Sequence, residues 1–263
     1  MMVVKVGGAD GNESDNVLVD LAPRTGYVLV HGGSGEVDRI ATAIGAPPRF
    51  LTSPSGVISR YTDETTMEVF TMALPGKLNT HMVARLCSLG VRAVGLSGVD
   101  GGLLVARRKE AVRTVDGGRV LLVRDDLSGV VEEVNAELLR TLLTAGYVPV
   151  ISPPVATASG ELINVDADRI AAKVAVALHA DLLLIFTNVP GLLREPGDPS
   201  TLIREVPRER LTYFMEFAYG RMKKKLIAAK EALEGGVPRV VIASSQVADP
   251  VERALSGSGT VIE

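Results

Sequence analysis

Three lysines open a predicted helix in the segment YGRMKKKLIAAK, residues 219–230. Cations are unfavourable at the positive end of a helix dipole unless an anion lies nearby. On a 3.6-residue wheel, Lys225 lies about 60° from the centre of the apolar stripe, Lys223 about 90° away, and Lys224 roughly opposite. The stripe is formed by Met222, Leu226, Ala229 and Leu233. We therefore expect Lys224 in solvent and Lys225 at the edge of the core, where it can meet an anion.

A fourth lysine, Lys5, interrupts the apolar run VVKVGG at residues 3–8. Side chains alternate along a strand, so Lys5 points to the face opposite to Val4 and Val6. A charge in an apolar strand is paired or functional, unless the strand lies at a sheet edge and the lysine is solvated.

The acidic partner for these lysines is expected in the segment NVDAD, residues 164–168. Asp166 suits a helix N-cap, and the dipole alone favours Asp168 in the first turn. Asp168 can equally hold two ammonium groups or help to gather Mg²⁺ through water. Asn164 precedes the helix and offers a neutral donor.

Glycine pairs follow the first two apolar runs, at Gly7 and Gly8 and at Gly32 and Gly33. They are either ordinary turn residues or positions where backbone N–H groups approach phosphate or carboxylate oxygens. The P-loop G-x-x-x-x-G-K-S/T, the dinucleotide motif G-x-G-x-x-G and the hydrolase motif G-x-S-x-G are absent from the sequence. Any bound phosphate must therefore be met by lysines together with glycine amides.

The elements that must position these residues alternate between strands and helices. Six short apolar runs predict buried strands near 3–8, 27–33, 93–98, 147–154, 182–191 and 239–245. Helical patterns cover 65–90, 135–146, 166–180 and 221–236. This alternation predicts an α/β fold, a three-layer αβα sandwich with a mainly parallel sheet. A β-hairpin is expected within 103–134 and a flap or loop pair within 46–64. We divide the single domain into lobes of about 1–159 and 160–263.

Composition limits the function further. The chain has 263 residues, 46% of them hydrophobic, and a net charge of -3, which argues against a nucleic-acid-binding face. No apolar run approaches the roughly 18 residues of a membrane span, and no signal-peptide pattern begins the sequence, so we expect a cytoplasmic protein. The single cysteine, Cys87, and three scattered histidines give no metal-ligand spacing, and Cys87 is expected to be a small buried helix residue.

Taken together, the motifs KVGG, VHGGSGE, GLSGVDGG, NVDAD, TNVPGL and GRMKKK occur in the order and spacing of the amino-acid kinase superfamily. Over nearly its whole length the chain most resembles the N-acetylglutamate kinase group. The longer segment SPSGVISRYTDE is more similar to the branch whose substrate, 2-aminoadipate or glutamate, is attached to a small acidic amino-group carrier protein. This resemblance implies ATP-dependent phosphorylation of the side-chain carboxylate, in lysine or arginine biosynthesis.

The resemblance also implies roles for residues. Lys5 and Lys225 would neutralise the moving phosphoryl group, with Asp168 orienting both lysines and Mg²⁺ held through the ATP phosphates. The acceptor site would contain Gly32, Gly33, Ser34, Arg60 and Asn164. The nucleotide site would contain Gly7, Gly8, Thr187, Asn188, Gly191, Met222 and Lys223.

The first predicted strand comes without the extra N-terminal helix of hexameric relatives, so we expect a homodimer. The implied partner is the carrier, whose docking surface has as candidates the basic residues Arg49, Arg60, Arg107, Arg108, Lys109 and Arg113; solvated surface charge is the alternative. Two other functions stay open: N-acetylglutamate kinase, and a non-catalytic nucleotide or amino-acid sensor.

Overall fold

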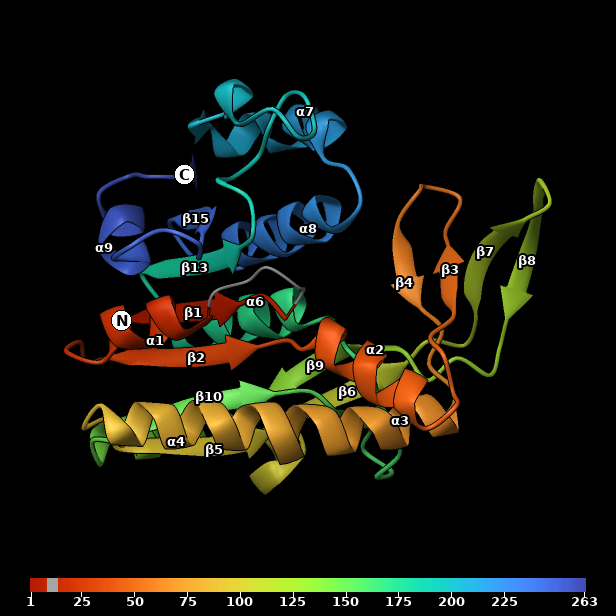
Figure 1. Cartoon of the computed structure of the whole chain (residues 1–263), viewed down its shortest axis with the longest axis horizontal. Coiled ribbons are helices and arrows are strands. Elements are labelled where there is room, and N and C mark those ends of the chain that lie inside the picture. The colour runs from red at the N-terminus through yellow and green to blue at the C-terminus, as the bar shows by residue number, and fades with distance from the viewer. Residues whose placement is uncertain (9–13) are drawn as a thin grey trace.

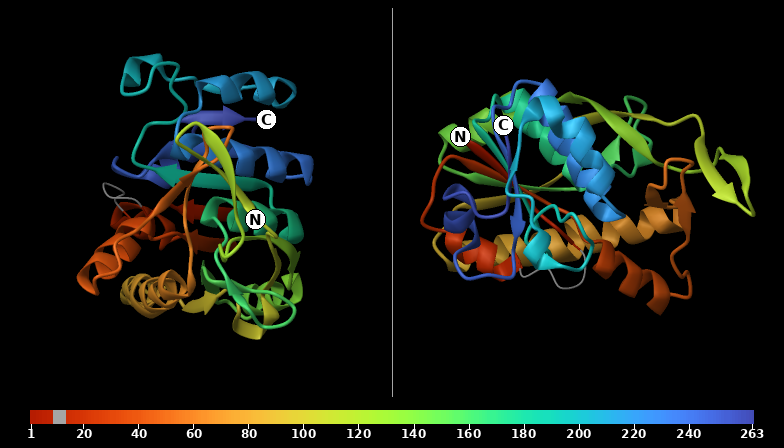
Figure 2. Two further views of the ribbon diagram at one scale, coloured as in Figure 1. Left: turned by 90° about the vertical axis from the view of Figure 1, so that its right-hand side faces the viewer. Right: turned by 90° about the horizontal axis from the view of Figure 1, so that it is seen from above.

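The fold has three layers, with helices on both faces of a large central sheet and two hairpins projecting to one side (Figure 1). The structure is a computed structural model that describes residues 1–8 and 14–263. Two further views show the same layers and the projecting hairpins (Figure 2). The predicted αβα sandwich with a mainly parallel sheet is confirmed. None of the described helices is long and apolar enough to cross a membrane.

Among the described residues, the central sheet has eight strands in the order β14, β16, β15, β13, β1, β2, β10, β5. The predicted apolar runs form six of them: β1 (Met2–Val6), β2 (Tyr27–His31), β5 (Ala93–Ser97), β10 (Val148–Ser152), β13 (Leu182–Thr187) and β15 (Val240–Ser244). These six run parallel, so their carboxyl ends share one edge of the sheet. The sequence patterns did not reveal the short strands β14 (Glu205–Val206) and β16 (Thr260–Ile262), of which β16 is antiparallel to β15.

Helices cover both faces of this sheet. One face carries α1 (Ser14–Leu21), α4 (Thr80–Ser88) and α9 (Pro250–Leu255), and the other carries α5 (Ala136–Thr144), α6 (Ala167–Leu178) and α8 (Arg221–Glu234). The remaining helical segments are α2 (Ser34–Ala43), α3 (Glu64–Thr71), the π-helical η1 (Met72–Asn79), α7 (Leu211–Phe214) and the 3₁₀ turns η2 (Asp100–Gly102), η3 (Pro199–Thr201), η4 (Arg208–Arg210) and η5 (Met215–Phe217). The helix expected at 65–90 is the continuous run of α3, η1 and α4.

A second, four-stranded sheet lies beside the main one, in the order β12 (Leu162–Ile163), β11 (Val155–Ala156), β6 (Leu104–Arg108), β9 (Gly129–Val134). The hairpin expected within 103–134 is confirmed as β7 (Val112–Asp116) and β8 (Arg119–Val123), and it projects from this sheet. The predicted flap contains a second hairpin, β3 (Phe50–Thr52) and β4 (Ile58–Arg60). Thr52 N donates a hydrogen bond to Thr114 Oγ1 at 3.2 Å, which ties the two hairpins together.

Cys87 corrects one expectation, because it is exposed on α4 rather than buried. Met82 and Leu86 form the buried stripe of this helix. Cys87 follows Leu86 by one residue, which turns its side chain about 100° away from that stripe.

Strand β1 lies in the interior of the sheet, with β2 on one side and β13 on the other. The solvated edge-strand alternative for Lys5 is therefore wrong, and Lys5 is only 5% exposed. Val4 and Val6 belong to the core beneath α1, α4 and α9, whereas Val3 belongs to the core beneath α6 and α8. Alternation thus sends Lys5 toward α6 and α8 at the edge where parallel strands place ligands.

Candidate functional site

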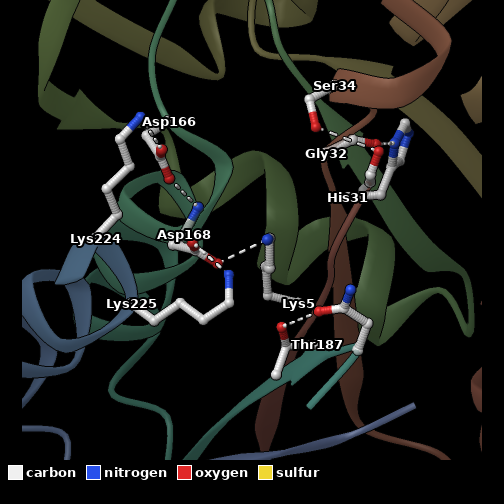
Figure 3. Close-up of polar contacts among 11 residues, drawn as sticks. Lys5, His31, Gly32, Ser34, Asp166, Asp168, Thr187, Lys224 and Lys225 are labelled. Carbon is white, nitrogen blue, oxygen red and sulfur yellow. Dashed lines mark hydrogen bonds and ion pairs between the residues drawn. The ribbon is translucent and has the colours of Figure 1, made fainter. Parts of the chain in front are cut away.

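Two buried lysines meet on one buried carboxylate at this edge of the sheet (Figure 3). Lys5 Nζ lies 2.7 Å from Asp168 Oδ1, and Lys225 Nζ lies 3.0 Å from Asp168 Oδ2. Each of the three residues is at most 6% exposed. Together they carry a net charge of one positive unit where water hardly reaches, which favours a bound anion.

The local structure of α6 and α8 sets this geometry. Asp166 caps α6, since its Oδ1 accepts a hydrogen bond from Asp168 N at 2.9 Å. Asp168 lies in the first turn of α6 and points to the sheet. Lys225 lies about one and a half turns into α8. Lys224 is not free in solvent as expected: its side chain is 25% exposed and its Nζ lies 3.3 Å from Asp166 Oδ2. The wheel gave its direction correctly, but α6 places a carboxylate on that side.

The electrostatics keep the central carboxylate ionised. Burial raises the pKa of Asp168, but Lys225 and Lys5 outweigh that effect, so its pKa falls well below the usual range. Burial lowers the pKa of Lys5 from its ordinary value, with Lys225 adding to the effect and Asp168 opposing it. Asp168 is therefore a fixed anion between two cations rather than a proton acceptor.

The glycine pairs lie beside Lys5 at the ends of β1 and β2. A Cβ added to Gly8 would stand 2.0 Å from Gly33 N, so only glycine lets these two backbones approach. Among the described residues, no backbone hydrogen bond is donated by the N–H of Gly8 or Gly33. Gly7 N, in contrast, donates to Phe186 O at 3.2 Å, and Gly32 N donates to Val6 O at 3.2 Å. Two amide donors and two lysines thus fit the oxygens of a phosphate group.

The expected acceptor residues gather next to this cradle. Arg60, at the end of β4, lies 2.5 Å from Asp38 Oδ1 and 3.5 Å from Ser34 O through its Nη2. Its Nη1 is buried and has no hydrogen-bond partner among the described residues. Ser34 Oγ donates to Gly8 O at 3.4 Å, so it is tied to the glycine pairs. Asn164 Nδ2 donates to Thr62 Oγ1 at 3.2 Å. Because Thr62 follows Arg60 by two residues, this bond holds the Asn164 amide near Arg60.

The expected nucleotide residues are more dispersed. Thr187 ends β13 next to Lys5 in Figure 3, and its Oγ1 donates to Asn188 Oδ1 at 3.5 Å. An added Cβ at Gly191 would stand 2.5 Å from Thr260 Oγ1, so this glycine is required by packing. Met222 packs partly buried against the core under α8. Lys223 Nζ donates to Ser55 O at 2.7 Å, across to the turn of the β3–β4 hairpin.

Sequence reasoning missed two groups of residues that hold the site. Asp38 pairs with Arg60, and a buried His31 and Asn79 lie behind the glycine pair of β2. These partners lie 22 and 48 positions apart in the sequence. His31 lies in the motif VHGGSGE, but no short motif contains both members of either pair, so spacing alone gives no signal.

Comparison with known proteins identifies the family. The profile of the amino acid kinase family matches residues 1–244. The chain belongs to this family. The prediction of a kinase is thereby confirmed, and the alternative of a non-catalytic sensor loses its support.

A LysW-aminoadipate kinase of Deinococcus radiodurans is 51% identical over 100% of this chain and 91% of its own length. A protein of the same name from Thermus thermophilus is 48% identical over 100% of both chains. An acetylglutamate kinase of Methanopyrus kandleri is 42% identical, again over 100% of both.

Solved structures agree on the fold. N-acetylglutamate synthase from Neisseria gonorrhoeae, complexed with coenzyme A and N-acetyl-glutamate, superposes with a TM-score of 0.79 at 28% identity over 99% of this chain. This chain spans 58% of that longer protein. Carbamate kinase from Giardia lamblia, bound to AMP-PNP, has a TM-score of 0.66 at 17% identity, covering 99% of this chain and 97% of its own. That second likeness shows the amino-acid kinase fold alone.

Replacing Asp168 with asparagine should leave two buried ammonium groups facing each other without a counter-ion. We expect Asp168→Asn to lower the free energy of unfolding by about 3 to 5 kcal/mol, the usual cost of removing one partner from a buried pair. Chemical denaturation measures this loss, with Asp181→Asn as control because Asp181 is exposed and pairs only with the N-terminus. Equal stability of the two variants would contradict the arrangement.

Stability should also depend on pH through His31. Burial lowers the pKa of His31 to about 4, and the charge of Lys5 acts in the same direction. In the unfolded chain His31 binds a proton near pH 6.5, whereas in the folded chain it stays neutral down to about pH 4. The free energy of unfolding therefore falls as pH drops from about 6.5 to 4. Relative to His31→Gln, the wild type should lose about 3 kcal/mol over this range. The free energy of unfolding of both proteins is measured at pH 4, 5.5 and 7. An equal loss in the two proteins between pH 7 and pH 4 would disprove a neutral buried His31.

Proposed function

We propose that this kinase transfers the γ-phosphoryl group of ATP to the side-chain carboxylate of 2-aminoadipate or glutamate carried by a small amino-group carrier protein, giving an acyl phosphate in lysine or arginine biosynthesis. The arrangement of Lys5 and Lys225 on Asp168, together with Gly8 and Gly33 at the ends of the neighbouring strands β1 and β2, carries the proposal. The relatives named LysW-aminoadipate kinase, at 51% and 48% identity, support the choice of acceptor.

The chemistry needs no general base. The acceptor carboxylate is already ionised near pH 7. One of its oxygens bonds to the γ-phosphorus while the bond from that phosphorus to the bridging oxygen breaks, and ADP leaves with the electron pair. Charge on the transferring group is stabilised by Lys5, Lys225 and the two glycine amides, so positioning and neutralisation suffice. Asp168 keeps both ammonium groups aimed and does not exchange a proton.

Mg²⁺ would enter with the nucleotide. No group of three or more His, Cys, Asp or Glu side chains among the described residues could hold a metal ion. The ion would therefore depend on ATP phosphate oxygens and water, with Asp166 and Asp168 as the nearby carboxylates.

The two lobes divide the work in this proposal. Residues 1–159 provide Gly32, Gly33, Ser34 and Arg60 for the acceptor. The buried Nη1 of Arg60, which has no hydrogen-bond partner among the described residues, suits a carboxylate oxygen. Residues 160–263 provide Lys225 and the nucleotide residues Thr187, Asn188, Gly191, Met222 and Lys223. Asn164 belongs to the second range, but its amide faces Thr62 of the first.

The carrier would approach over the projecting hairpins. Arg107 and Arg108 are already paired with Glu132 and Glu161, and Arg49 with Asp63. These pairs reduce the field that those arginines offer to a partner. Arg113, exposed on β7, and Lys109, partly buried after β6, have no ion pair among the described residues and remain the stronger candidates.

Acceptor choice is tested by trapping the acyl phosphate with hydroxylamine while ATP consumption is followed. We expect turnover with aminoadipate or glutamate linked to the carrier and none above background with free N-acetylglutamate. Asp168→Asn serves as the inactive control. Efficient turnover of free N-acetylglutamate would instead support the acetylglutamate kinase alternative. The basis for this alternative is the acetylglutamate kinase of Methanopyrus kandleri, at 42% identity.

We further propose a homodimer formed along strand β5. This strand is the open edge of the central sheet, and its residues are partly or fully exposed. An open, regular edge invites pairing with a second copy. Light scattering on the purified protein should give twice the mass of the 27.7 kDa chain at micromolar concentration. A monomer or a hexamer would contradict the proposal.

A further inference from the structure

Behind the glycine pair of β2 lies a buried polar chain that none of the phosphate-binding roles accounts for. His31 is the last residue of β2 and is 0% exposed. Its Nδ1 lies 2.9 Å from Gly32 O, and its Nε2 lies 3.1 Å from Asn79 Nδ2. Asn79 Nδ2 also lies 2.9 Å from Val150 O on β10. The two contacts of Asn79 are buried and the contact with Gly32 O is partly buried, so each needs a proper donor and acceptor.

These contacts fix which ring nitrogen carries the proton. Val150 O can only accept, so the atom of Asn79 that faces it is the amide nitrogen. That nitrogen donates its second hydrogen to His31 Nε2, which must then be unprotonated. Gly32 O also only accepts, so Nδ1 carries the hydrogen. His31 is thus neutral, with its proton on Nδ1.

The position of Asn79 is itself built into the fold. It ends the π-helical segment Met72–Asn79, which contains Pro75, and π-helical turns place side chains off the ordinary helical face. An added Cβ at Gly95 on β5 would stand 2.1 Å from Asn79 Oδ1, so glycine makes room for this amide. The same segment supports Gly33 directly, since an added Cβ there would lie 2.3 Å and 2.4 Å from side-chain atoms of Leu78 and Leu74.

The consequence concerns the peptide that joins Gly32 to Gly33. In a planar trans peptide the C=O and the following N–H point in opposite directions. Holding Gly32 O on the His31 ring therefore turns Gly33 N–H away from the ring, and Gly8 is the residue that approaches Gly33 N. Two glycines in succession are otherwise free to rotate this peptide.

We propose that His31 and Asn79 are positioning residues for phosphoryl transfer: the chain of contacts from Gly95 through Asn79 and His31 to Gly32 locks the Gly33 amide toward the reacting phosphate. The proposal rests on the phosphate-binding role proposed above for Gly33. Neither residue touches a reacting group, and both act through one backbone peptide. A misdirected amide lowers the stabilisation of the transferring group, so turnover suffers more than substrate binding.

The decisive variant is Asn79→Asp, which offers His31 Nε2 a carboxylate and leaves Val150 O without its donor at every pH. A protonated His31 then donates to this introduced carboxylate through Nε2 and still donates to Gly32 O through Nδ1. When His31 loses a proton, the carboxylate retains the one on Nε2, and Nδ1 turns its lone pair toward Gly32 O. Apart from the introduced carboxylate, the charged group acting on His31 is Lys5, which Asp168 holds on β1.

We therefore expect kcat of Asn79→Asp to be highest at low pH and to fall about 10- to 100-fold as pH rises through the His31 titration. KM for ATP should change less than about threefold. The wild type should show no such fall in kcat over pH 6 to 8.

Gly95→Ala, which displaces Asn79 without changing its chemistry, should lower kcat at every pH. His81→Gln is the matched control, since His81 is exposed on α4 two residues from Asn79. A flat pH profile in Asn79→Asp, or a loss confined to KM, would overturn the proposal.

A second measurement needs neither an acceptor nor a folded variant of Asn79. In the ¹⁵N spectrum of wild-type protein at pH 7, assigned with His81→Gln and His179→Gln, His31 should show a protonated Nδ1 and a bare Nε2. The reverse tautomer would refute the contact chain. Because this readout is independent of the acceptor, its failure is distinguishable from a wrong assignment of the substrate.

Discussion

The structure depends on one interaction, the pairing of two buried lysines with a single buried carboxylate. Lys5 and Lys225 approach Asp168 at 2.7 Å and 3.0 Å, and none of the three has appreciable access to water. One anion cannot neutralise two cations, so the protein interior retains a positive charge whose solvation is incomplete. This incomplete solvation is tolerated because the charge faces the strand ends, where a polyanionic ligand can balance it. Stability and catalysis are therefore two aspects of the same electrostatic arrangement.

Much of the fold serves to bring this interaction and its glycine neighbours together. An interior strand supplies Lys5, a capped helix supplies Asp168, and a second helix on the same face supplies Lys225. Gly8 and Gly33 approach from the ends of two adjacent parallel strands, where sterics permit no side chain. The strands that flank β1 come from different halves of the chain, and this is where open α/β sheets place their ligands.

The sequence predicted the elements whose pattern is local. Apolar runs showed the six parallel strands, and the charge of Lys5 within such a run indicated that it had a special partner. Strands of two or three residues, such as β11, β12 and β14, are too short to show a period, so one edge of the first sheet and the β11–β12 half of the second were not foreseen. Lys224 was expected free in solvent because a wheel gives a direction around a helix but not the carboxylate that the neighbouring helix offers there. Cys87 was misplaced because its residue type was considered without its position about 100° from the stripe of Met82 and Leu86. His31 looked like the end of a strand, since its partner Asn79 comes close only when η1 packs against β5 and β10.

The place of β1 in the sheet has a consequence for how the chain is assembled. Met2 to Val6 are synthesised before Tyr27 to His31, which then pair along one side. The other side must wait for β13, where Met2 pairs with Leu182. During that interval the nascent chain presents an unpaired parallel edge next to a lysine whose counter-ion has not yet been made. Such non-local pairing is slow and exposes aggregation-prone surface, so β1 is a point at which synthesis and folding of this protein are most vulnerable.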